Sequence, residues 1–75
     1  MELNGLKIRQ SGHDYLAEKL NLPDWYGRNL DALYDCLCEM DIDIELSSPE
    51  LVDDDIIETF KDASRENDNL TFKIL

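Results

Sequence analysis

Residues 22–37 read LPDWYGRNLDALYDCL and join a loop rich in aromatic residues and glycine to the start of an amphipathic helix. Asn29 is a suitable N-cap, because its side chain can accept a hydrogen bond from a free backbone N–H of the first turn. Apolar residues then follow at spacings of three, four and three, which predicts one buried helical stripe. The stripe consists of Leu30, Leu33, Leu37 and Met40.

Three acidic residues lie on the other side of this predicted helix. Asp31, Asp35 and Glu39 recur every four residues, so at about 100° per residue they form one exposed ridge. Tyr34 and Cys38 lie at its border. Like charges at this spacing cost about 0.2–0.5 kcal/mol per pair, and acids near the C-terminal end of a helix oppose its dipole. Helix stability therefore does not explain the ridge, which suits docking into a basic cleft in place of phosphates.

The formal net charge of −11 comes from one stretch of the chain. Eighteen Asp and Glu residues stand against seven Lys and Arg, and eleven of the acids fall between Asn29 and Phe60, where no base occurs. An acidic field attracts a basic partner and repels nucleic acid and anionic membranes, so we expect no direct binding to either. Such a surface could also serve solubility alone.

The loop before the helix carries two large aromatic residues, Trp25 and Tyr26. Aromatic side chains are favoured anchors at interfaces, and Gly27 lets a partner come close to the backbone. Aromatic residues in such a loop also commonly fill the core beneath it, and one can be buried while the other is exposed.

Three short segments of alternating apolar residues predict three strands. The segments contain Leu3, Leu6 and Ile8 around an Asn4-Gly5 turn signal, then Ile42, Ile44 and Leu46, then Leu70, Phe72 and Ile74. Polar residues occupy the other faces of these strands, whereas strands covered on both sides would be apolar throughout. We therefore expect helices mainly on one side of the sheet.

Helices are also predicted before and after the second strand. Ser11 can cap a helix over residues 12–20. Another helical pattern lies between Ser48 and Asn67, where a serine and a proline resemble an N-cap and first helical residue. The string Asp53-Asp54-Asp55 can interrupt this pattern, so one helix or two are both compatible with the sequence.

The order strand, helix, helix, strand, helix, strand favours parallel strands joined by right-handed crossovers. The predicted fold class is therefore α/β in two layers, a three-stranded parallel sheet with helices packed mainly on one face. Residues 1–75 form a single domain, because so short a chain cannot divide its core.

Cys36 and Cys38 lie about 200° apart around the predicted helix and point away from each other. We therefore expect no disulfide between them. Nothing resembles a secretory signal or a membrane span, so the expected location is the reduced cytoplasm.

The stretch 22–37 closely resembles the barstar family, intracellular protein inhibitors of bacterial ribonucleases of the barnase type. The resemblance is dense over these sixteen residues and weaker at both ends of the chain. It implies a parallel three-stranded sheet with helices, which agrees with the fold expected from the strands. It also implies a ribonuclease inhibitor, which is not an enzyme and needs no cofactor or metal. The residues that carry it include Leu22, Pro23, Tyr26, Gly27, Asn29, Leu30, Asp31, Ala32, Leu33, Asp35, Cys36 and Leu37.

The resemblance also implies a partner-binding site. Asp35 would lie at its centre, with its carboxylate in the place of a substrate phosphate, and Asp31 would be the second charged contact. The implied partner is one molecule of a small basic ribonuclease or toxin nuclease, bound by a chain that is a monomer when free. Further contacts would come from the loop, the two sides of the helix and a neighbouring element, through Trp25, Gly27, Asn29, Leu30, Tyr34, Cys38 and Glu50.

Three positions depart from the barstar family pattern. Trp25, Arg28 and Tyr34 stand where the family has Tyr, Glu and Trp, and Arg28 adds a positive charge at the edge of the acidic surface. The chain is also several residues shorter over the range 46–56, which leaves little room for the short extra helix expected there. The target can therefore differ from barnase itself.

Other sites are weakly supported. His13 near Ser11 and Asp14 suggests a catalytic triad, but these residues are better explained by helix capping. A zinc site of His13 with the two cysteines lacks a fourth ligand, and residues 41–45 resemble a calcium loop without its glycine. The alternative function is an acidic adaptor or nucleic-acid mimic for another basic protein, in which charge is spread evenly and no single carboxylate matters much.

Overall fold

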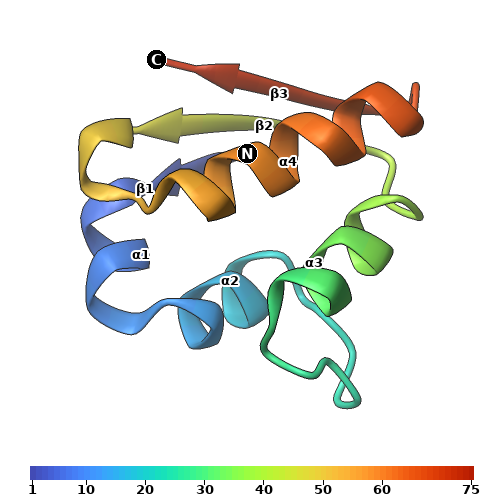
Figure 1. Ribbon diagram of the computed structural model, residues 1–75, viewed down its shortest axis with the longest axis horizontal. Coiled ribbons are helices and arrows are strands. Elements are labelled where there is room, and N and C mark those ends of the chain that lie inside the picture. The colour runs from blue at the N-terminus through green and yellow to red at the C-terminus, as the bar shows by residue number, and fades with distance from the viewer.

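A computed structural model describes residues 1–75 and contains three strands, four α-helices and one short 3₁₀ helix. Figure 1 shows the strands together at the top, with the helices below and in front of them. None of the helices combines the length and the apolar character needed to cross a membrane. In chain order the elements are β1 (Glu2–Asn4), α1 (Gly5–Ser11), α2 (His13–Lys19), α3 (Leu30–Leu37), β2 (Ile42–Ser47), the 3₁₀ helix η1 (Pro49–Leu51), α4 (Asp54–Glu66) and β3 (Leu70–Ile74).

The three strands form one parallel sheet in the order β1, β2, β3, as the sequence predicts. Side chains that point toward the helices are buried, including Leu3 of β1 and Ile44 and Leu46 of β2. The opposite face is polar and exposed, and on it the Thr71 hydroxyl donates a hydrogen bond to Asp43. The helices therefore cover one face, and the predicted two-layer α/β architecture is confirmed.

The first predicted strand is wrong beyond Asn4. The Asn4 side chain accepts hydrogen bonds from the backbone N–H groups of Leu6 and Lys7, so it caps α1 and ends the strand. A Cβ atom at Gly5 would lie 2.2 Å from the backbone oxygen of Ser48, so only glycine allows this close approach. The alternation of apolar residues after Asn4 is short enough to fit the first turn of a helix equally well.

The predicted cap at Ser11 is also wrong. Ser11 is the last residue of α1, and α2 begins at His13 after Gly12, whose φ of 54° lies in the left-handed region. The N–H of Gly12 donates to the carbonyl of Ile8, which closes the end of α1. Because Asn4 already begins a helix, the chain needs a break at Gly12 rather than a cap at Ser11.

The segment between Ser48 and Asn67 contains two helices. The 3₁₀ helix η1 occupies a single turn, and α4 follows with Asp53 as its N-cap. The string of aspartates therefore marks the start of α4. Asp54 and Asp55 fall in its first turn, where the helix dipole favours negative charge.

The core lies between the sheet and the helices and is entirely apolar apart from Thr59. Phe60 of α4 is buried and stacks on Phe72 of β3, with ring centroids 5.1 Å apart. Leu33 and Leu37 of α3 are fully buried, which confirms the centre of the predicted stripe. Leu30 and Met40, at the two ends of the stripe, are only partly buried, and the opposite side of α3 is exposed.

Candidate functional site

The acidic ridge, defined as Asp31, Asp35 and Glu39, is exposed along its whole length. None of its carboxylates forms a salt bridge. The two salt bridges of the chain join Arg28 to Asp14 and Arg65 to Asp62. The ridge therefore presents unpaired negative charge to solvent.

The ridge is only partly helical, because α3 ends at Leu37 rather than near Met40. The N–H of Glu39 donates to the carbonyl of Cys36, and that of Met40 to the carbonyl of Leu37, so the chain tightens into three-residue turns. The side-chain amide of Asn67 donates to the carbonyls of both Leu37 and Met40, at 3.1 and 2.7 Å. The end of α3 is thus fixed by a residue that follows α4.

At the other end, Asn29 caps α3 as predicted. Its Oδ1 accepts a hydrogen bond of 2.8 Å from the N–H of Ala32, and its Nδ2 donates to the carbonyl of Gly27 at 3.2 Å. Asp31 lies in the first turn, where the dipole favours it, and Asp35 lies near the C-terminal end, where the dipole opposes it. Asp35 is therefore the less favourable of the two carboxylates for the helix.

The two cysteines of α3 lie in different surroundings, and both are free. Cys36 is buried, and its pKa is raised first by this burial and then by the negative charges of Asp35 and Glu39. Its thiol therefore stays protonated at neutral pH. Cys38 is partly exposed beside Tyr34.

Tyr34 and Cys38 border the ridge on the side that faces α4. The pKa of Tyr34 is raised by its contact with the Cys38 side chain, then by partial desolvation and by the charges of Glu66 and Asp62. These two acids of α4 therefore lie beside the ridge. Sequence reasoning missed them, although their spacing of four residues on one helix is the same signal that marked Asp31 and Asp35.

Glu50, predicted as a contact from a neighbouring element, is exposed on η1. It lines a cleft of about 620 Å³ that reaches from η1 and α1 to the beginning of α3, where Leu30 forms part of the wall. Glu50 thus lies toward the N-terminal end of α3, whereas the acids of α4 lie beside its middle.

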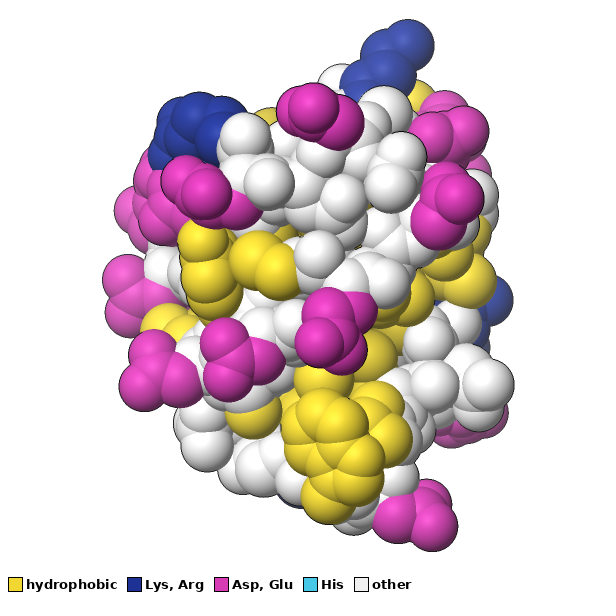
Figure 2. Space-filling view, turned by 90° about the vertical axis from the view of Figure 1, so that its right-hand side faces the viewer, with side chains coloured by type: hydrophobic (Ala, Val, Ile, Leu, Met, Phe, Trp, Pro, Cys, Tyr) yellow, Lys and Arg dark blue, Asp and Glu magenta, His cyan; other side chains and the backbone are white.

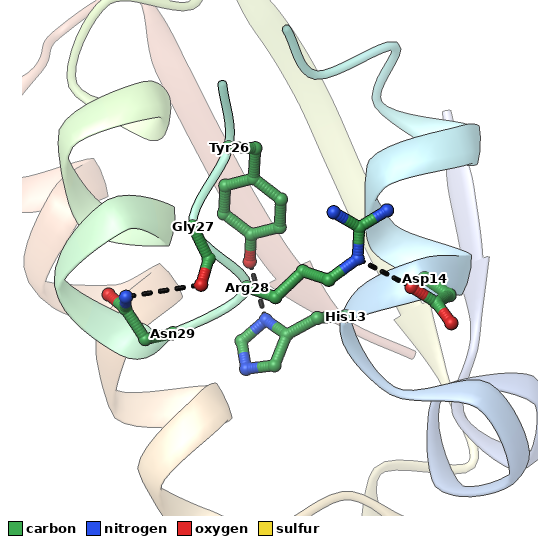
Figure 3. Close-up of polar contacts among 6 residues, drawn as sticks. All are labelled: His13, Asp14, Tyr26, Gly27, Arg28 and Asn29. Carbon is green, nitrogen blue, oxygen red and sulfur yellow. Dashed lines mark hydrogen bonds and ion pairs between the residues drawn. The ribbon is translucent and has the colours of Figure 1, made fainter. Parts of the chain in front are cut away.

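The loop before α3 separates its two aromatic residues. Trp25 is 71% exposed and Tyr26 only 3%, so one faces solvent and the other fills the core. The hydroxyl of Tyr26 lies 2.5 Å from Nδ1 of His13 (Figure 3), and burial raises the pKa of Tyr26 to about 12. Its phenol is therefore protonated near neutral pH and forms a hydrogen bond with the imidazole.

Arg28 has φ of 52° and donates through Nε to Asp14 at 2.6 Å (Figure 3). This bond is the main reason that the pKa of Arg28 is raised. His13 and Asp14 thus bind the loop, and Ser11 is not part of a triad with them. No group of three or more His, Cys, Asp or Glu side chains is placed to hold a metal ion.

Figure 2 shows the face of the molecule that lies at the right of Figure 1. Acidic side chains are spread over this face among hydrophobic ones, and basic side chains occur only in its upper part and at its margins. All nine residues of the predicted site are exposed or partly exposed, and eight of them belong to the loop, α3 and the turn that follows.

Residues 1–75 match the family model described as Barstar (barnase inhibitor) over the whole chain. The chain belongs to the barstar family. A relative in Bacillus subtilis (strain 168), the protein YrdF, is 39% identical over 64 residues, which cover 72% of this chain and 70% of the relative. The name of YrdF proposes that it is a ribonuclease inhibitor. Membership of the barstar family confirms the resemblance of residues 22–37.

Proposed function

We propose that this chain inhibits a small basic ribonuclease of the barnase type by binding one-to-one over its active site. The observation that carries the proposal is the acidic ridge, three exposed carboxylates that form no salt bridge within the chain. Membership of the barstar family and the name of YrdF support a ribonuclease as the target.

In the proposed complex the ridge takes the place of an RNA backbone. A ribonuclease holds its substrate with Lys and Arg side chains, which bind a carboxylate as they bind a phosphate oxygen. Asp35 lies at the middle of the ridge and meets the catalytic cations, while Asp31 meets a cation nearer the start of α3. Glu66 of α4 adds negative charge beside Tyr34, where Asp62 is paired with Arg65.

The loop supplies the apolar part of the same interface. Trp25 presents an exposed aromatic surface that can pack on the enzyme, and exposed anchors of this kind commonly dominate binding energy. Gly27 and Asn29 are exposed between Trp25 and the ridge, so the partner can approach the backbone there. Inhibition follows because the enzyme cannot hold RNA and the ridge at the same time.

The test is inhibition of a panel of small basic ribonucleases, including any encoded beside this chain. Asp35→Ala is expected to weaken binding by about 2–5 kcal/mol, the range typical of buried charge pairs at interfaces in general, because enzyme cations lose their partner. Kd is measured by titration of the ribonuclease activity.

Glu45→Gln is the matched control, because Glu45 is an exposed carboxylate on the uncovered face of the sheet. It should leave Kd almost unchanged. Equal inhibition by the wild type and Asp35→Ala would refute the role of Asp35. Binding to basic proteins with no loss of nuclease activity would instead indicate the acidic adaptor.

A further inference from the structure

The loop between α2 and α3 is tied to the first turn of α2 by two side-chain contacts (Figure 3). Asp14 accepts a hydrogen bond from Arg28, and His13 pairs with the hydroxyl of Tyr26, with ring centroids 5.7 Å apart. Consecutive residues of α2 therefore hold two loop residues that are themselves only two positions apart. Such a double attachment fixes both the position and the orientation of the loop.

The backbone of Arg28 also needs this support. Its φ of 52° lies in the left-handed region, which residues other than glycine rarely adopt unless their surroundings hold them there. Arg28 directly precedes Asn29, the cap of α3. The conformation at Arg28 therefore decides how the loop enters the helix that carries the acidic ridge.

Arg28 is also the only Lys or Arg between residues 20 and 60. Its guanidinium is exposed, and with Asp14 it forms an ion pair that is exposed on both sides. Exposed pairs of this kind add little to the stability of a fold. The pair has a larger effect on the charge of the surface, because Asp14 offsets the positive charge that Arg28 carries directly before α3.

We propose that His13 and Asp14 are positioning residues for the partner-binding surface. His13 holds the loop through Tyr26, and Asp14 holds Arg28 and masks its charge from a basic partner. This inference rests on the proposed function, because masking has an effect only where the partner is itself positively charged. Neither residue needs to touch the partner.

The positioning role is tested in the free protein by backbone ¹⁵N relaxation of residues 25–28. Order parameters in the wild type should be about 0.85, the value of a rigid backbone, and should be clearly lower in Asp14→Asn. Tyr26→Phe, which keeps the ring and removes the hydroxyl, tests the contact with His13 in the same way. Glu18→Gln is the control, because Glu18 is an exposed acid of α2 that forms no salt bridge. Unchanged loop order parameters in Asp14→Asn and Tyr26→Phe would overturn the positioning role.

The masking role is tested by association kinetics with a nuclease that the wild type inhibits. At about 20 mM salt Asp14→Asn should associate at least about threefold more slowly than Glu18→Gln, although both variants lose one negative charge. The double variant Asp14→Asn with Arg28→Gln keeps the net charge of −11 and should regain the rate of the wild type, since no positive charge is left to mask. At about 0.5 M salt the difference should disappear.

Equal rates for Asp14→Asn and Glu18→Gln, or no recovery in the double variant, would overturn masking. A wild type that inhibits no nuclease in the panel would refute the proposed function, and masking with it. The relaxation measurements on the loop would still decide the positioning role, so the two failures are distinguishable.

Discussion

Trp25 and Tyr26 show how far the surroundings of two neighbouring residues can differ. Both are large aromatic residues in one loop, yet one is exposed and the other is part of the core. The difference depends on His13, thirteen residues earlier, which gives the hydroxyl of Tyr26 a partner inside the fold. The sequence allows one of the two residues to be buried and the other exposed. It does not show which one is buried, because the hydrogen-bond partner of Tyr26 comes from another helix.

Burial of Tyr26 predicts a loss of stability at alkaline pH. The pKa of its phenol is about 12 in the folded chain and 10.0 in the reference state, so folding favours the protonated form. The contribution of Tyr26 is complete below pH 10.0 and is lost as the pH rises to about 12, by up to about 2 kcal/mol. Urea unfolding of the wild type and Tyr26→Phe across this range measures it. The wild type should lose stability more steeply, and parallel curves would contradict the assignment.

At the scale of the element, the start of α3 is stabilised by neighbouring residues, whereas its end depends on a distant residue. Its N-cap and inner stripe depend on neighbouring residues, so the sequence predicts them correctly. Its end at Leu37 depends on Asn67, which lies thirty residues away and reaches the carbonyls there. The same holds for α1, where close packing of Gly5 on Ser48 accompanies a helix in place of the predicted strand. Local rules predicted the cap at Asn29 but not the cap at Asn4, and they missed the end of α3 that a distant residue fixes.

We predict that the like charges of α3 favour binding to a basic partner but lower the stability of the helix. Asp35→Asn should raise the unfolding free energy by about 0.2–0.5 kcal/mol, because it removes a repulsion across one turn and a charge that opposes the dipole. The same substitution should weaken binding to the nuclease. Urea unfolding followed by circular dichroism measures the gain.

Asp31→Asn is the comparison for this prediction. It relieves the same repulsion but removes a charge that the dipole favours, so its effect on stability should be close to zero. A clear destabilisation by Asp35→Asn would show that this carboxylate makes a favourable contact in the free chain.

At the scale of the whole molecule, the two layers of the fold (Figure 1) present different side chains to solvent. The sheet presents a polar face, whereas the ridge, the loop between α2 and α3 and the cleft lie in the helical layer. Which acids of α3 and α4 lie together depends on how these helices pack. Sequence patterns therefore predicted the exposed ridge of α3 but not its neighbours Asp62 and Glu66.

The net charge of −11 predicts opposite effects of salt on folding and on binding. Screening reduces repulsion among the acids of the free chain, so added NaCl should raise Tm, by about 4 °C or more for each kcal/mol gained. It should weaken the complex, because attraction to a basic enzyme is screened as well. Thermal melts and inhibition titrations over one salt series test this. A Tm that falls with NaCl would mean that favourable ion pairs dominate the free chain.

The exposure of Trp25 determines what tryptophan fluorescence can report about this chain. It is the sole tryptophan, and its indole is already largely in contact with water in the native state. Its emission should therefore change little on denaturation, which makes intrinsic fluorescence a poor optical probe of folding here. The same indole should shift its emission toward shorter wavelengths when another protein covers it. Trp25 is therefore an intrinsic fluorescent probe of complex formation.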